Sequence, residues 1–185
     1  MPAVPRRSRL IGIPLTAALI GVAAIAACTG GSDGGSGHDG VTVNAIPSGA
    51  FMATVNYVHD GDTLYLDNGT AEVKVRLIGI DTPEVSSAQR PDAEECYGIE
   101  ARELLRDFLP EGTAVWALHD REPEDRYGRS LLYVYLQDGT FINLAMVELG
   151  AAEALKVGPN DRYWSELRNA EDEASSARLG MWAAC

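Results

Sequence analysis

An α+β domain built on a small closed sheet is the fold class that this 185-residue sequence predicts. Five segments rich in apolar and β-branched residues have the pattern of strands, and three segments carry apolar residues at helical spacing. Their order is strand, strand, strand, helix, strand, strand, helix, helix. Five strands with one helix after the third predict a five-stranded β-barrel with three packed α-helices.

The first three strands are separated by two turn signals. Residues 51–59 predict a strand that ends at Asp60-Gly61-Asp62, and the extended pattern resumes over residues 63–66. Asp67-Asn68-Gly69 is a hairpin signal. Apolar and polar residues then alternate, which predicts a third strand over residues 73–80.

The remaining elements follow a loop expected over residues 85–95. Residues 97–109 predict a helix, and residues 113–118 and 131–136 predict the last two strands. Asn143 is expected to cap a short helix that Gly150 ends. A final apolar stripe predicts a helix over residues 163–177. The oligonucleotide-binding (OB) barrel has this arrangement and presents one sheet face to nucleic acid.

The N-terminal residues read as a targeting segment rather than as part of the fold. Residues 1–27 combine three arginines with an apolar run that ends at Ala27 and Cys28, which resembles a bacterial lipoprotein signal with Cys28 as the acylated residue. A cleaved secretory signal and a retained membrane anchor are the alternatives. Residues 28–50, rich in Gly and Ser at their start, predict a flexible tether, and residues 51–185 form the folded domain. We therefore expect a lipid-anchored protein on the extracytoplasmic face of the cell membrane, or alternatively a secreted one.

Charge and cysteines set two further expectations. Removing residues 1–27 takes away three arginines and no acid, so the formal net charge changes from −12 to −15. A strongly negative chain repels nucleic acid, unless a bound cation or focused arginines offset the charge. In an oxidising compartment Cys96 and Cys185 predict a disulfide, with two free thiols as the alternative.

Three short clusters of acids and arginines carry the chemistry. They are Asp60-Gly61-Asp62-Thr63, the block of residues 76–84, and Asp125-Arg126-Tyr127-Gly128-Arg129. Their carboxylates are suited to a hard cation, and their arginines are suited to phosphate oxygens. A cation and two guanidinium groups around one phosphodiester would promote its hydrolysis.

Five segments of the chain resemble the staphylococcal nuclease (thermonuclease) family: residues 60–63, 76–84, 97–101, 125–129 and 180–182. The similarity covers about residues 53–182, nearly the whole domain. The resemblance implies an OB barrel with three helices, and a Ca²⁺-dependent nuclease that cleaves DNA and RNA to products with 3′-phosphate ends. We expect it to act as a monomer.

The resemblance also implies roles for particular residues. Asp62 and Asp81 would bind Ca²⁺ through their carboxylates, and Thr82 through its main-chain carbonyl. Glu84 would act as the base or orient the attacking water. The phosphate would be held by Arg76 and Arg129.

One departure from the family concerns the nucleotide contacts. The family's best-known member has two tyrosines before a Lys-Pro-Asn turn, whereas this chain has Leu155-Lys156-Val157-Gly158-Pro159-Asn160. The loss of aromatic stacking and the acidity of the chain favour a second hypothesis, a non-catalytic binding module tethered to the membrane. Lys156 is expected to touch a phosphate or, alternatively, only solvent.

Overall fold

The computed structural model describes residues 45–86 and 94–185. The predicted leader, Cys28, the tether up to residue 44 and residues 87–93 of the predicted loop lie outside the described residues. In the described part of the chain, no helix combines the length and the apolar character needed to cross a membrane.

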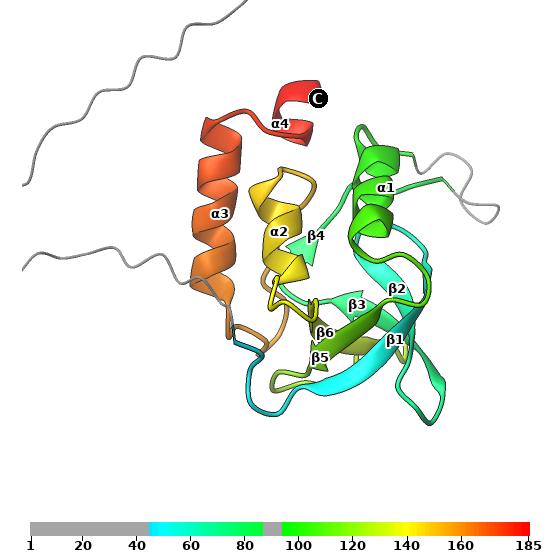
Figure 1. The fold of residues 1–185 in the computed structure, drawn as a ribbon. Helices are drawn as coiled ribbons and strands as arrows, with labels where there is room; N and C mark the ends of the chain where they lie inside the picture. Colours follow the sequence, from blue (N-terminus) through cyan, green and yellow to red (C-terminus); the bar gives the residue numbers. More distant parts are fainter. Residues whose placement is uncertain (1–44, 87–93) are drawn as a thin grey trace, which may run out of the picture. The chain divides into compact units, whose positions relative to one another are not determined.

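A closed five-stranded barrel forms the centre of the domain, as the sequence predicted (Figure 1). Its strands are β1 (Phe51–Val58), β2 (Thr63–Asp67), β3 (Glu72–Leu77), β5 (Ala114–Leu118) and β6 (Ser130–Tyr135). They close in the order β1-β2-β3-β6-β5, with β3 and β6 parallel and the other pairs antiparallel. This is the arrangement of the OB fold.

Three longer helices and one short helix pack beside the barrel. They are α1 (Gly98–Phe108), α2 (Ile142–Glu148), α3 (Trp164–Ser176) and α4 (Met181–Ala184). In Figure 1, α2 lies between α1 and α3, and it packs against both. Each long helix buries one apolar face: Ala101 and Leu105 from α1, for example, join the main core. The sequence analysis did not predict α4, which is too short to show a helical period.

The third predicted strand was too long. Instead of running to residue 80, β3 ends at Leu77, and a turn at Ile78 and Gly79 separates it from β4 (Ile80–Asp81). Gly79 has a φ of 81°, in the left-handed region that breaks the strand pleat. β4 then pairs with β7 (Glu153–Ala154) in a second, two-stranded sheet. The turn thereby moves Asp81 off the line of β3.

The predicted capping role of Asn143 was wrong. Asn143 lies inside α2 and is fully buried, and the N-cap is Phe141, which makes no side-chain cap. The amide of Asn143 accepts a hydrogen bond from the Val134 main chain at 2.9 Å and donates one to Ile78 O at 2.9 Å. Because a buried amide needs such partners, Asn143 serves as a tie between α2, β6 and the turn after β3.

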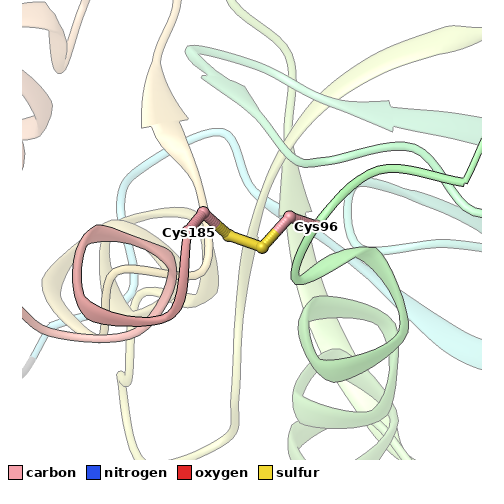
Figure 2. Close-up of a disulfide and its surroundings, with 2 residues drawn as sticks. All are labelled: Cys96 and Cys185. Carbon is pink, nitrogen blue, oxygen red and sulfur yellow. A yellow bond between two sulfur atoms is a disulfide. The ribbon is translucent and has the colours of Figure 1, made fainter.

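Cys96 and Cys185 form a disulfide that joins two distant segments (Figure 2). Cys96 lies shortly before α1, and Cys185 follows α4 at the end of the chain. The bridged residues are 89 positions apart, with their Cα atoms separated by 6.0 Å. The bridge therefore closes most of the domain into one covalent loop, as the sequence analysis expected.

Candidate active site

A polar pocket of about 270 Å³ collects the side chains that the sequence analysis selected. Asp62 comes from the turn between β1 and β2, Arg76 from β3, and Asp81 from β4. Glu84 follows β4, and Arg129 directly precedes β6. The complete lining is His59, Asp60, Asp62, Thr63, Lys74, Arg76, Asp81, Thr82, Pro83, Glu84 and Arg129. Residues that are distant in the sequence thus surround one volume.

Asp62 is the most deeply held carboxylate of the pocket. Its Oδ2 accepts hydrogen bonds from the main chain and the hydroxyl of Thr82, at 3.1 and 3.2 Å, and its Oδ1 accepts one from Thr63 Oγ1 at 3.1 Å. Asp60 supports the turn by accepting a hydrogen bond from the Asp62 main chain at 3.2 Å. Burial raises the pKa of Asp62 above its usual range.

Arg76 joins the two aspartates. Its guanidinium lies 3.0 Å from Asp62 Oδ2 and 2.7 Å from Asp81 Oδ1, and it also donates to Leu77 O at 3.0 Å. The Asp81 side chain is 57% exposed, whereas that of Arg76 is 13% exposed. Arg76 thus neutralises an inner and an outer carboxylate at once. Each of these contacts is one that a cation or a phosphate would compete for.

Glu84 stands on a segment whose main chain is clamped. The Glu84 N–H donates to Glu95 Oε2 at 3.0 Å, and the Glu95 N–H donates to Glu84 O at 2.9 Å. Gly98, the first residue of α1, lies directly against the Glu84 main chain, where a Cβ would collide with Glu84 O. Since Cys96 is held by the disulfide, the segment of Glu95 is tied to the C-terminus as well.

A tight turn presents Arg129 to the pocket. Asp125 Oδ2 accepts from Arg129 Nε at 2.7 Å, and Asp125 Oδ1 accepts from the main chains of Tyr127 and Arg129 at 2.9 and 3.0 Å. Gly128 permits the turn with a φ of 77°. Burial tends to raise the pKa of Asp125, but the hydrogen bonds from Arg129 and Tyr127 outweigh it and lower this pKa below its usual range.

The ligand set that the sequence analysis assigned to a cation consists only of oxygens. The described residues hold no group of three His, Cys, Asp or Glu side chains arranged for a metal ion. Two carboxylates, Asp62 and Asp81, nevertheless face the pocket beside Thr82. Carboxylate, carbonyl and water oxygens are the donors that Ca²⁺ and Mg²⁺ prefer, so the chemistry of these residues fits a hard cation.

A second pocket, of about 490 Å³, shares Arg76 and Arg129 with the first. Its other walls include Tyr127, Leu155 and Val157. Tyr127 is 69% exposed, and the guanidinium groups of Arg126 and Arg129 lie 4.7 and 5.7 Å from its ring centroid. The sequence analysis noticed that aromatic residues were missing near residue 155 but not that Tyr127 lines the same hollow.

Lys156 is accounted for by a contact within the protein. Its Nζ donates to Asp161 Oδ2 at 3.1 Å, and it lines neither of these two pockets. The structure therefore gives no support to a phosphate contact for this lysine.

Comparison with known proteins decides the family. The family model described as "Staphylococcal nuclease homologue" matches residues 74–184. The chain belongs to the staphylococcal nuclease family. The match contains most of the pocket described above, including Arg76, Asp81, Glu84 and Arg129.

Individual members of the family are similar over most of the domain. The chain is 38% identical to the thermonuclease of Staphylococcus intermedius over 128 residues, which are 69% of this chain and 74% of that protein. It is 32% identical to the thermonuclease of Staphylococcus hyicus over 126 residues, or 68% of this chain and 72% of that one. Endonuclease YhcR of Bacillus subtilis is 29% identical over 140 residues, 72% of this chain but 12% of that protein. These nuclease relatives support a nuclease function for this chain.

Proposed function

We propose that this protein is a Ca²⁺-dependent phosphodiesterase that cleaves DNA and RNA internally and leaves 3′-phosphate ends. The observation that carries the proposal is the meeting of two aspartates, two arginines and Glu84 around one polar pocket. Family membership supports the same reaction class.

Asp62, Asp81 and the carbonyl of Thr82 would hold the cation. When bound, Ca²⁺ would polarise a phosphoryl oxygen and offset part of the negative charge of substrate and protein. Asp62 is fixed by Thr63 and Thr82, so one side of this ligand set is organised by the protein's own hydrogen bonds.

Arg76 and Arg129 would bind the phosphate that is cleaved. In the structure Arg76 is paired with Asp62 and Asp81, and a substrate phosphate would take over the guanidinium from them. Arg129 keeps its orientation through Asp125, which grips its Nε and main chain and leaves the rest of the guanidinium for the substrate. Both groups would stabilise negative charge as it increases on the phosphoryl oxygens.

Glu84 would accept a proton from the attacking water or hold that water in line. Attack of the water oxygen on phosphorus breaks the bond from phosphorus to the 5′ oxygen, so the phosphate remains on the 3′ oxygen. The 5′ oxygen leaves and takes up a proton from solvent, which gives a 5′ hydroxyl. The clamp between Glu84 and Glu95 would keep the position of the carboxylate well defined.

The site of action we propose is the outer face of the cell membrane, with acylated Cys28 as the anchor and secretion as the alternative. Labelling of cells with a fatty-acid analogue tests this point. Incorporation into the natural chain, but not into Cys28→Ser, is the expected result, and equal incorporation in both would exclude the anchor.

The reaction is tested with the purified full-length chain and single-stranded DNA or RNA labelled at the 5′ end. We expect cleavage with Ca²⁺ and none with a chelator, and products that change mobility when a 3′-phosphatase treats them. Glu84→Gln and Arg129→Gln should each lose roughly 10²–10³-fold in kcat, whereas Glu166→Gln, an exposed change on α3, should not.

Two results would contradict the proposal. If Glu84→Gln cleaves the substrate as fast as the natural chain does, Glu84 neither accepts the proton nor holds the water. Ca²⁺-dependent binding without any product would instead support the alternative, a tethered binding module; the acidic chain and the apolar Leu155 and Val157 favour that alternative.

A further inference from the structure

A row of aromatic and cationic side chains crosses the outer face of the barrel next to the candidate active site. We call it the tyrosine row; it consists of Tyr57, His59, Tyr65, Lys74 and Arg106. β1, β2 and β3, which lie side by side in Figure 1, carry Tyr57, Tyr65 and Lys74. His59 directly follows β1, and Arg106 belongs to α1. None of them belongs to the catalytic set proposed above.

Strand register explains why the row forms. Tyr57 of β1 pairs with Tyr65 of β2, and Tyr65 pairs with Lys74 of β3. Paired residues of neighbouring strands place their side chains on the same face, so these three side chains stand beside one another. The irregularity in β1 between Val55 and Tyr57 turns Tyr57 outward, where it is 42% exposed.

The row is continuous with the active-site pocket. The next outward-facing pair along the same strands is Thr63 and Arg76, which both line that pocket. Lys74 and His59 belong to the row and to the pocket lining at once. A chain of nucleotides whose phosphate lies on Arg76 therefore reaches the row without leaving the protein surface.

The aromatic rings of the row suit the unpaired bases of single-stranded nucleic acid, and its cationic side chains suit the phosphates. The ring centroids of Tyr57 and Tyr65 lie 6.3 Å apart, which offers two separate surfaces for unpaired bases. Lys74 Nζ lies 5.8 Å from the Tyr65 centroid, and in the described part of the chain Lys74 forms no ion pair. The other lysine of the chain, Lys156, is paired with Asp161. Lys74 is thus available for a phosphate.

The far end of the row is fixed by α1. Arg106 donates to Val58 O at 3.1 Å and pairs with Glu103 at 3.0 Å, and its guanidinium lies 5.7 Å from the Tyr57 centroid. Beyond it, Tyr57 and Arg106 line a shallow hollow of about 380 Å³. The next outward pair towards the β2–β3 hairpin, Asp67 and Glu72, is acidic and would repel a phosphate backbone.

We propose that the tyrosine row is an extended binding site for single-stranded DNA or RNA, and that it guides the strand from the hollow at Arg106 to the scissile phosphate. This inference rests on the proposed nuclease function for its substrate class. Stacking of bases on the tyrosine row would let a chain with a net charge of −12 bind a polyanion, because most of the binding energy would come from the rings. Only a few cationic side chains would then need to contact phosphates.

The test measures the affinity of the full-length chain for fluorescent single-stranded oligonucleotides by anisotropy, with a chelator present so that the probe stays intact. Two nucleotides and twelve nucleotides are the probe lengths. Tyr57→Ala and Tyr65→Ala should each weaken the binding of the longer probe by about 5- to 150-fold, the equivalent of ~1–3 kcal/mol of stacking per base. The ratio of the affinity for the twelve-nucleotide probe to that for the two-nucleotide probe should therefore fall in both variants.

Matched variants separate stacking, charge and folding. Tyr57→Phe and Tyr65→Phe keep the ring and should keep the affinity. Lys74→Gln should flatten the dependence of log Kd on log salt by about 0.7, the value for one phosphate contact to a single strand, whereas the tyrosine variants should leave the slope unchanged. Met52→Ala, an exposed change on the same strand β1, should have no effect.

Cleavage measured separately with Ca²⁺ keeps the two proposals distinguishable. A chain that binds through the row but never cuts would refute the nuclease while supporting the row. Unchanged affinity of Tyr57→Ala and Tyr65→Ala, in variants that melt like the natural chain, would refute the row whether or not the protein cleaves.

Discussion

Gly98 offers the most direct way to move Glu84 without touching it. Gly98 opens α1, and a Cβ at this position would collide with Glu84 O and stand 3.0 Å from Glu84 C and 3.1 Å from Pro83 O. All three atoms belong to the main chain, so no side chain can swing aside. Restoring ordinary separations of ~3.5 Å requires a shift of about 1 Å in the segment that carries Glu84.

We therefore expect Gly98→Ala to lower kcat by about 10²-fold, because misplacement of a reacting group by about 1 Å costs that much. KM should change less, since Arg76 lies on β3 and Arg129 directly precedes β6, both away from the segment that would move. The assay is steady-state cleavage of a single-stranded oligonucleotide with Ca²⁺. Thermal unfolding of the same samples shows whether the variant is folded.

The neighbouring residue Ile99 supplies the control. It is 42% exposed on the same turn of α1, so Ile99→Ala should keep both kcat and stability close to those of the natural chain. A folded Gly98→Ala protein with unchanged kcat would show that the position of Glu84 does not limit the reaction, and the role argued for its clamp would be withdrawn.

Three further changes probe the scaffold. Asn143→Ala leaves two buried main-chain groups without their partner and should lower the free energy of unfolding by about 2–6 kcal/mol in urea titrations; an unchanged free energy of unfolding would contradict this. Replacing Cys96 and Cys185 together by serine should cost about 4–5 kcal/mol in the chain-entropy model; an equal melting temperature with and without the bridge would contradict this. Asp125 has a lowered pKa when folded, so its stabilising effect should be full above its ordinary pKa and should disappear as the pH falls through the lowered value. The stability difference between the natural chain and Asp125→Asn should therefore narrow in acid, and a difference that grows there would refute the argument.

Local patterns in the sequence were enough to predict the five barrel strands, though not the end of the third, and the three longer helices. Alternation and helical spacing are properties of neighbouring residues, and they survive without knowledge of the fold. The same patterns failed where a long-range contact decided the outcome. Asn143 looks like a cap because asparagine is common at helix starts, but its amide is hydrogen-bonded to Val134 on β6 and to Ile78 in the turn after β3.

The pocket shows the same division between sequence and tertiary structure. The sequence by itself selected the residues that we propose for the chemistry, because carboxylates suit a hard cation and guanidinium groups suit a phosphate. Only the tertiary structure decided that Arg76 bridges Asp62 and Asp81, that Glu95 clamps Glu84, and that two tyrosines and a lysine line up beside them. The physical reason is that strand register and chain closure set these distances, and both depend on pairings between residues far apart in the chain.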